Sequence, residues 1–308
     1  MTTAIDLFAG LGGWTCAAEQ AGVRVLWAAN HSTRAVHYHA LNHPGALHAC
    51  QDLQQADFRA APRHDVLLAS PSCTGHTRAR GKDEPHHDAA RATAWAVVTC
   101  AEVHRPPLVL VENVPEFLTW VLYPAWEAAM KALGYAVSPH IVDAADHGVA
   151  QHRTRVFIVC TRSRAPLTLT LDTEPHIAAE TVIRWDRYDW APIDRANRSP
   201  WTLRQVEHGR SLGLDRFILP YFKAARQGKT PSVREVSRPF GALTTHDRYG
   251  IVDGDRMRML HYREAAVVMG FPASTILPQD QRAAMHLLGN AIVPSVGRKV
   301  LLGALNHL

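Results

Sequence analysis

The stretch AIDLFAGLGG, residues 4–13, is a short apolar run followed at once by a glycine-rich turn. Residues 14–21 continue it with a helical pattern, so the predicted order is strand, glycine turn and helix. This order brings backbone N–H groups and a helix N-terminus against a ligand, and glycine permits close approach because it lacks Cβ. The stretch therefore predicts an α/β fold, although the turn alone suits a dinucleotide, an adenosyl cofactor or no ligand.

The second predicted strand, residues 25–30, ends in Asn30 and is followed by His31. In nucleoside-binding α/β units this strand end meets the ribose, where an acidic residue usually accepts from the hydroxyl groups. Asn30 or His31 can hydrogen-bond a diol, although less strongly than a carboxylate does. Asp52 follows the next apolar piece and either accepts from an adenine amino group or caps its own turn.

Cys73 follows a continuous apolar run at residues 65–69, and Glu112 follows a second one at residues 108–111. Continuous runs of this kind are typical of parallel strands covered on both faces. Because the carboxyl ends of neighbouring parallel strands open into one cleft, we expect a nucleophile and an acid to share a site. Either residue alone is weaker evidence for a catalytic site, since a lone cysteine is commonly just a buried core residue.

Arg153 and Arg155 precede the last predicted strand of the sheet. In an extended segment they project to one side, where they hold a phosphate or a carbonyl oxygen, or simply form a basic strand edge. The spacing of apolar residues also predicts helices over residues 116–133 and 295–307.

From about residue 163 to residue 245 the helical periodicity weakens and Arg, Trp and Tyr become frequent, which indicates a separate, irregular small domain. Residues 184–238 contain 12 Lys or Arg and 6 Asp or Glu, a net charge of +6, whereas the whole chain carries +5. The excess positive charge is what a phosphate-backbone contact needs, although a solvated basic face explains it equally well.

The composition is that of a globular protein of 308 residues, 47% of them hydrophobic. Its five cysteines are scattered without a CxxC pair, which argues against a disulfide framework or a zinc site and favours reduced thiols in a cytoplasm. The first residues lack the pattern of a signal peptide, and no apolar run approaches membrane-spanning length.

The order of these motifs resembles that of the DNA (cytosine-5) methyltransferase family over nearly the whole chain. Residues 6–13, DLFAGLGG, are similar to its cofactor motif, and Cys73 stands at the place of its nucleophile. Residues 112–114 match its ENV triplet, residues 151–155 its QxRxR motif, and residues 289–294 its closing GN motif. The cysteine's neighbours depart from the family pattern: Ser72 replaces the usual proline and Thr74 the usual glutamine. At the ribose position, Asn30-His31 replaces the usual glutamate.

The resemblance implies a Rossmann-like S-adenosylmethionine-dependent methyltransferase sheet flanked by helices, with a second, small irregular target-recognition domain. The implied boundaries are 1–162 for the catalytic and cofactor-binding domain, 163–258 for target recognition, and 259–308 for a segment returning to the catalytic domain. The implied catalytic residues are Cys73, Glu112, Arg153 and Arg155. The implied ligands of S-adenosyl-L-methionine are Phe8, Gly10, Leu11, Gly12, Gly13, Asn30, His31, Asp52, Leu53, Pro71 and Asn290. DNA contacts are expected from Arg78, Arg80 and Lys82, and no metal is expected.

The implied function is methylation of carbon 5 of a flipped-out cytosine in a specific double-stranded DNA sequence, through a covalent Cys73 adduct. A cytosine-5 methyltransferase acting on RNA is an alternative, because the recognition region is small. A catalytically inactive DNA-binding homologue is another, which the presence of Cys73 and Glu112 disfavours. A third alternative, a nicotinamide-dependent dehydrogenase, is supported by the glycine turn alone. We expect a cytoplasmic monomer of bacterial or phage origin, with a paired restriction endonuclease as a further conceivable partner and no membrane contact.

Overall fold

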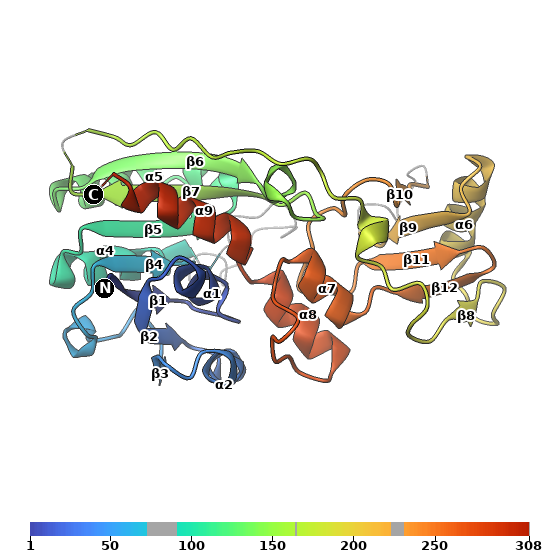
Figure 1. The fold of residues 1–308 in the computed structure, drawn as a ribbon, viewed down its shortest axis with the longest axis horizontal. Helices are drawn as coiled ribbons and strands as arrows, with labels where there is room; N and C mark the ends of the chain where they lie inside the picture. Colours follow the sequence, from blue (N-terminus) through green and yellow to red (C-terminus); the bar gives the residue numbers. More distant parts are fainter. Residues whose placement is uncertain (73–90, 164, 223–230, 308) are drawn as a thin grey trace.

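The computed structural model describes residues 1–72, 91–163, 165–222 and 231–307. This part of the chain forms a larger body and a smaller body side by side (Figure 1). Helices α7 (Tyr262–Val268) and α8 (Gln281–Gly289) lie between the two bodies, and helix α9 (Pro294–Leu305) returns to the larger one. No helix in the described ranges is long and apolar enough to cross a membrane.

Within the described residues, the larger body contains a seven-stranded sheet in the order β3-β2-β1-β4-β5-β7-β6. Its strands are β1 (Thr3–Leu7), β2 (Arg24–Asn30), β3 (Leu47–Cys50), β4 (Val66–Ala69), β5 (Leu108–Asn113), β6 (Ala136–Asp143) and β7 (Thr154–Thr161). Pairs from β3 to β5 are parallel, whereas β7 runs antiparallel to both of its neighbours. The chain order reverses between β1 and β4, which is where an α/β sheet opens a ligand crevice.

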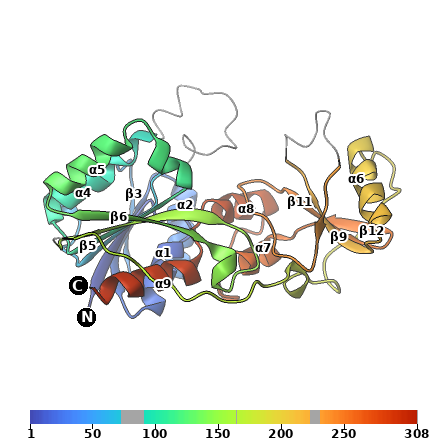
Figure 2. The same ribbon diagram turned by 90° about the horizontal axis from the view of Figure 1, so that it is seen from above.

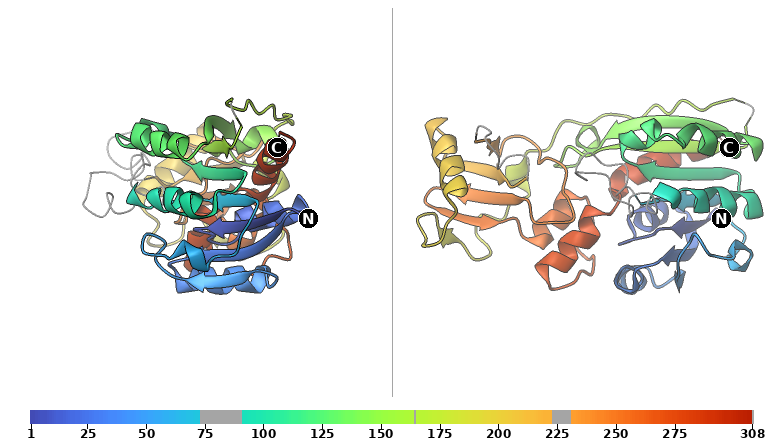
Figure 3. Two further views of the ribbon diagram at one scale, coloured as in Figure 1. Left: turned by 90° about the vertical axis from the view of Figure 1, so that its left-hand side faces the viewer. Right: turned by 180° about the vertical axis from the view of Figure 1, so that it is seen from behind.

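Both faces of this sheet are covered, which explains the continuous apolar runs. In β5, Leu108 and Leu110 join one apolar cluster, while Val109 and Val111 join the other. Helices α1 (Gly13–Gln20), α2 (Thr33–Asn42) and α9 cover the first face, and α4 (Trp95–His104) and α5 (Tyr123–Ala132) cover the second. Figures 2 and 3 show α4 and α5 on the side of the sheet opposite α1 and α9. Burying an aliphatic side chain in this way contributes about 1.5–3 kcal/mol. The predicted α/β sheet with flanking helices is therefore confirmed.

The helix expected over residues 116–133 is wrong in its first half. The chain forms a short 3-10 helix at Pro115–Thr119, and α5 begins only at Tyr123. Pro124 lies in the first turn of α5, where the missing N–H costs nothing; in a helix interior the same residue would remove a hydrogen bond and clash with the preceding turn. Pro124 therefore explains why α5 begins at Tyr123 and does not continue from the preceding 3-10 helix. Further short 3-10 helices lie at Phe58–Ala60, Ala144–His147 and Ala179–Thr181.

The smaller body is more regular than the sequence indicates. In the ranges that the structure describes, it contains a five-stranded antiparallel sheet in the order β10-β9-β11-β12-β8, with helix α6 (Pro200–Ser211) packed on it. Its strands are β8 (Ala191–Pro192), β9 (Arg216–Pro220), β10 (Arg234–Glu235), β11 (Tyr249–Asp253) and β12 (Arg256–Met259). β8 and β10 are only two residues long, so apolar periodicity cannot reveal them.

An extended segment after β7 still covers the larger body before the chain crosses to the smaller one (Figure 1). The Leu167 N–H donates to Ser138 Oγ of β6 over 2.7 Å, and the Glu174 N–H donates to the Asp146 carbonyl over 2.8 Å. Leu167, Leu169 and Leu171 pack against the larger core from this segment.

Candidate active site

The glycine turn after β1 has the backbone shape of a ligand-binding turn. Phe8, Gly10 and Gly12 adopt left-handed conformations, with φ of 61°, 56° and 96°. A side chain at Gly12 would be strained and would also lie 2.5 Å from His43 Nε2, so only glycine fits there. Leu11 is fully buried beneath the turn, and Gly13 begins α1 against Ile292. The turn thus leaves backbone groups and a helix N-terminus at the edge of the sheet.

The ends of β2 and β3 continue this edge. Strand pairing places Asn30 beside Cys50, and Asp52 and Leu53 follow directly. Asn30 is nearly buried, and its Oδ1 accepts from the Ser32 N–H over 2.9 Å. His31 is exposed, and Leu53 is buried. Asp52 is exposed, and its Oδ1 accepts from the Gln54 N–H over 3.0 Å, as the capping alternative predicts.

Cys73 lies outside the described residues, as do Arg78, Arg80 and Lys82, but the chain that leads into Cys73 is placed. The Pro71 carbonyl accepts from Asn113 Nδ2 over 3.0 Å, which ties the end of β4 to the end of β5. The Ser72 N–H donates to Thr93 Oγ1 over 3.0 Å. The chain therefore enters the Cys73 segment directly beside the strand that carries Glu112.

Glu112 is the acid of this edge, and Arg155 is its partner. Arg155 Nε lies 3.1 Å from Glu112 Oε1, and the two side chains are only 18% and 9% exposed. The pair forms because β7 runs antiparallel to β5, so the start of β7 reaches the carboxyl end of β5. A carboxylate at a buried strand end is costly unless it is paired, and here Arg155 supplies the partner.

Arg153 contacts a different part of the molecule. Its Nη1 donates to the Leu243 carbonyl over 2.9 Å, and its Nη2 donates to the carbonyls of Gly289 and Ala291 over 2.8 and 3.0 Å. Asn290 lies exposed between the last two. Gln151 adds a bond from its Nε2 to the Val268 carbonyl. The QxRxR segment therefore joins the larger sheet to the returning chain through Gln151 and Arg153, while Arg155 forms the ion pair with Glu112.

Many arginines of the smaller body are neutralised by neighbours. Arg216 and Arg256 both pair with Asp253. Arg258 donates to both oxygens of Glu264 over 2.7 Å, and both side chains are almost fully buried. This explains why the net charge of a segment overstates the positive surface that it presents.

The aromatic side chains of the smaller body take part in the same packing. Trp185 and Trp190 stack with their centroids 6.2 Å apart and their planes 12° apart. Arg216 lies over Trp185 at 4.5 Å, and Arg256 and Arg258 lie over Trp190 at 4.7 Å. These arginine–aromatic contacts are part of the packing of the smaller body.

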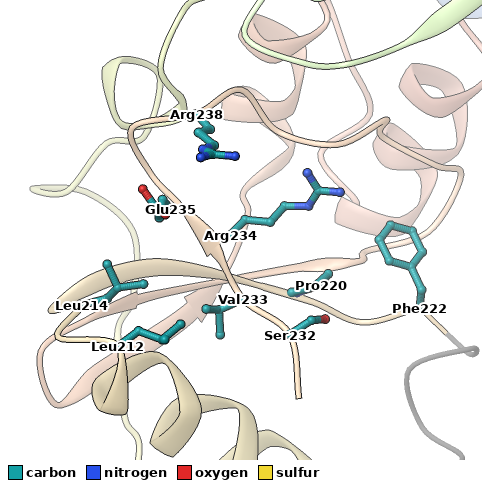
Figure 4. A pocket seen from close by; sticks show the side chains of 9 residues that line it. All are labelled: Leu212, Leu214, Pro220, Phe222, Ser232, Val233, Arg234, Glu235 and Arg238. Carbon is teal, nitrogen blue, oxygen red and sulfur yellow. The ribbon is translucent and has the colours of Figure 1, made fainter. Parts of the chain in front are cut away.

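A cavity of about 600 Å³ lies on the smaller sheet and contains two further arginines (Figure 4). Arg234 and Arg238 are exposed, and neither side chain has an ion pair or hydrogen bond within the described ranges. The cavity also includes Phe222 and Ser232. Glu235 also lines the cavity, which therefore combines two arginines and one carboxylate with apolar surface.

Three residues beneath the glycine turn have no role predicted from the sequence. Asp6 is fully buried and accepts from Thr15 Oγ1 over 2.8 Å, and Thr15 Oγ1 lies 3.0 Å from His39 Nε2. The sequence signal that could have revealed this cluster is Asp6 itself, because a carboxylate inside an apolar strand is costly to bury without a partner. Across the described ranges, no group of three or more His, Cys, Asp or Glu could hold a metal ion.

Comparisons with known proteins identify the family of the chain. The family model described as C-5 cytosine-specific DNA methylase matches residues 2–304. The Type II methyltransferase M.HhaI of Haemophilus parahaemolyticus is 24% identical over 312 residues, covering 95% of this chain and 90% of the relative. The Type II methyltransferase M.AgeI of Thalassovita gelatinovora is 33% identical over 166 residues, covering 50% of this chain and 38% of the relative.

Solved structures give the same fold. A DNMT2 variant of Spodoptera frugiperda has a TM-score of 0.72 at 17% identity, covering 99% of this chain and 100% of the other. Dnmt2 of S. pombe has a TM-score of 0.67 at 17% identity, covering 99% of each chain. Because the family model spans nearly the whole sequence, the chain belongs to the C-5 cytosine-specific DNA methylase family and is a methyltransferase.

Proposed function

We propose that this methyltransferase transfers a methyl group from S-adenosylmethionine to carbon 5 of a cytosine in double-stranded DNA. The observation that carries the proposal is the Glu112–Arg155 ion pair, which lies at the end of β5 beside the chain leading into Cys73. An acid oriented by a cation next to a thiol suits nucleophilic addition to a pyrimidine ring. The DNA substrate is supported by the family description and by the Type II relatives.

Carbon 5 of cytosine is a weak nucleophile and must be activated. In the proposed reaction the Cys73 thiolate bonds to carbon 6, the 5,6 double bond shifts to carbons 4 and 5, and ring nitrogen 3 takes a proton that Glu112 supplies or shares. Arg155 steadies Glu112, and Arg153 holds the surrounding chain in place. After methylation, a base such as water removes the carbon-5 proton, the 5,6 double bond reforms, and the thiolate leaves.

S-Adenosylmethionine supplies the electrophilic methyl group when it is bound. The turn from Phe8 to Gly13 fits this cofactor, because its left-handed residues leave room for close backbone approach and a buried Asp6 oxygen lacks a partner in the described ranges. We assign the cofactor site to residues of this turn, of the neighbouring strand ends and of the returning chain: Phe8, Gly10, Leu11, Gly12, Gly13, Asn30, His31, Asp52, Leu53, Pro71 and Asn290.

The same proposal assigns a role to each of the three segments of the chain. Residues 1–162 carry catalysis, residues 163–258 recognise the DNA target, and residues 259–308 complete the catalytic domain. A stacked cytosine is inaccessible, so it must leave the duplex at a cost of a few kcal/mol. Arg78, Arg80 and Lys82 are assigned to the phosphates flanking the flipped base. The protein would act as a cytoplasmic monomer, with a restriction endonuclease as a candidate companion.

The test is methyl transfer from labelled S-adenosylmethionine to duplex DNA and to transfer RNA, followed by bisulfite mapping of the DNA. Cys73→Ser should abolish transfer while leaving DNA binding largely intact, and Cys50→Ser, at an exposed cysteine, is the matched control. Turnover by Cys73→Ser at the wild-type rate contradicts the mechanism. Transfer to RNA alone overturns the DNA assignment.

A further inference from the structure

A chain of hydrogen bonds, buried except at its His48 end, runs beneath the cofactor turn. His48 Nε2 lies 2.8 Å from His39 Nδ1, and His39 Nε2 lies 3.0 Å from Thr15 Oγ1. Thr15 Oγ1 in turn donates to Asp6 Oδ2 over 2.8 Å. The chain crosses β3, α2, α1 and β1, and therefore connects the strand that leads into the turn with three neighbouring elements.

The direction of these bonds is fixed by their end point. An ionised carboxylate only accepts, so the Thr15 hydroxyl donates to Asp6 and its oxygen is free to accept from His39 Nε2–H. His39 Nδ1 must then accept from His48 Nε2–H. Burial lowers the pKa of His39 to about 3, so this histidine stays neutral, as the arrangement requires. Each donor points towards Asp6.

Other titratable groups surround the chain. Glu19 and Cys16 lie on α1, and His43 follows α2. His43 Nδ1 lies 2.9 Å from Glu19 Oε2, while its Nε2 faces Gly12 of the turn. Burial, with Glu19 nearby, raises the pKa of Cys16 to about 11, so its thiol stays neutral. Asp6 is thus the buried negative charge of this cluster.

Asp6 has an unused oxygen close to the cofactor turn. Its Oδ1 is buried and has no hydrogen-bond partner in the part of the chain that the structure describes. Burial raises the pKa of Asp6 to about 7, although the Thr15 hydroxyl and backbone N–H oppose that increase. Asp6 stands two residues before Phe8, where the left-handed turn begins.

We propose that the donor chain from His48 to Thr15 favours the ionised form of Asp6, and that this charge makes the turn prefer the methyl donor over the spent product. The inference rests on the proposed function. S-Adenosylmethionine carries a positive sulfonium, whereas S-adenosylhomocysteine has an uncharged thioether. A buried carboxylate therefore stabilises the first more than the second, because charges interact strongly where water is excluded. Product release is favoured for the same reason.

The experiment measures the dissociation constants of both compounds by titration calorimetry at pH 8.5, without DNA. In the wild type, S-adenosylmethionine should bind more tightly, and the preference should fall roughly tenfold in Asp6→Asn and in Thr15→Val. Thr15→Ser keeps the hydroxyl and should restore the preference. His37→Gln, at an exposed position two residues from His39, is the control and should behave as the wild type.

The wild type alone gives a second measurement, so the inference does not depend on a variant that folds. Asp6 takes up a proton as the pH falls through about 7, so the preference should decline between pH 8.5 and pH 5.5. A preference that is unchanged with pH, or unchanged in a folded Asp6→Asn protein, overturns the inference while leaving the proposed function intact. Failure of the wild type to bind either compound overturns both.

Discussion

A substitution of Arg153 should lower the free energy of unfolding more than most substitutions in this protein. Its side chain is 3% exposed and donates to the carbonyls of Leu243, Gly289 and Ala291. Arg153→Met removes three charge-assisted hydrogen bonds and leaves buried acceptors without that donor. Each such loss costs about 1–3 kcal/mol, so the free energy of unfolding should fall by about 3–5 kcal/mol, which allows for partial relaxation.

The assay is urea unfolding followed by tryptophan fluorescence, with three variants compared under one condition. Arg153→Lys keeps the charge but loses the planar fork, so it should show an intermediate loss. Arg59→Met removes an exposed ion pair with Asp57 and should leave the midpoint unchanged. If Arg153→Met unfolds at the same urea concentration as Arg59→Met, the hydrogen bonds of Arg153 do not stabilise the junction between the larger sheet and the returning chain.

Three further perturbations test the site and the packing. Glu112→Gln should lower the methylation rate roughly 100-fold, while calorimetry finds S-adenosylmethionine binding unchanged; a normal rate would remove Glu112 from the mechanism. Arg258→Met leaves the buried Glu264 carboxylate without its partner, so the free energy of unfolding in urea should fall by about 3–5 kcal/mol. Arg256 is half-exposed, and Arg256→Met should lower the free energy of unfolding far less. Burial lowers the pKa of His64 to about 4, so the unfolded chain binds more protons below pH 6.5 and the stability should fall from there towards pH 4. His64→Phe should make this loss of stability with falling pH less steep, although buried His39 still contributes to it, and an unchanged pH dependence contradicts the assignment.

The fold of the larger body could be predicted from the sequence because the patterns that indicate it are local in the chain. The glycine turn and the apolar runs before Cys73 and Glu112 predict strands buried on both faces, and that is what β1, β4 and β5 are. The direction of β7 was not accessible. A strand covered on both faces has the same composition whether it runs parallel or antiparallel, so the reversal that brings Arg155 to Glu112 leaves no mark in the sequence.

The same limit applies to the arginines. Alternation predicts that Arg153 and Arg155 share a side, but their partners come from residues 243 and 289–291 in one case and from β5 in the other. In the smaller body, charge counting cannot separate Arg258, which is buried against Glu264, from Arg234, which is exposed. Long-range contacts decide these roles, and sequence patterns describe only neighbours along the chain.

The position of α9 has a consequence for how the protein is made. Gly297 of α9 lies so close to α1 that an added Cβ would be 3.1 Å from Ala17 Cβ and 3.3 Å from the Trp14 ring. Helix α1 leaves the ribosome before α9, but its apolar covering is encoded at residues 294–305. A nascent chain therefore exposes this surface until α9 has been synthesised, and a product arrested before residue 294 keeps it exposed, as a substrate for chaperones and proteases.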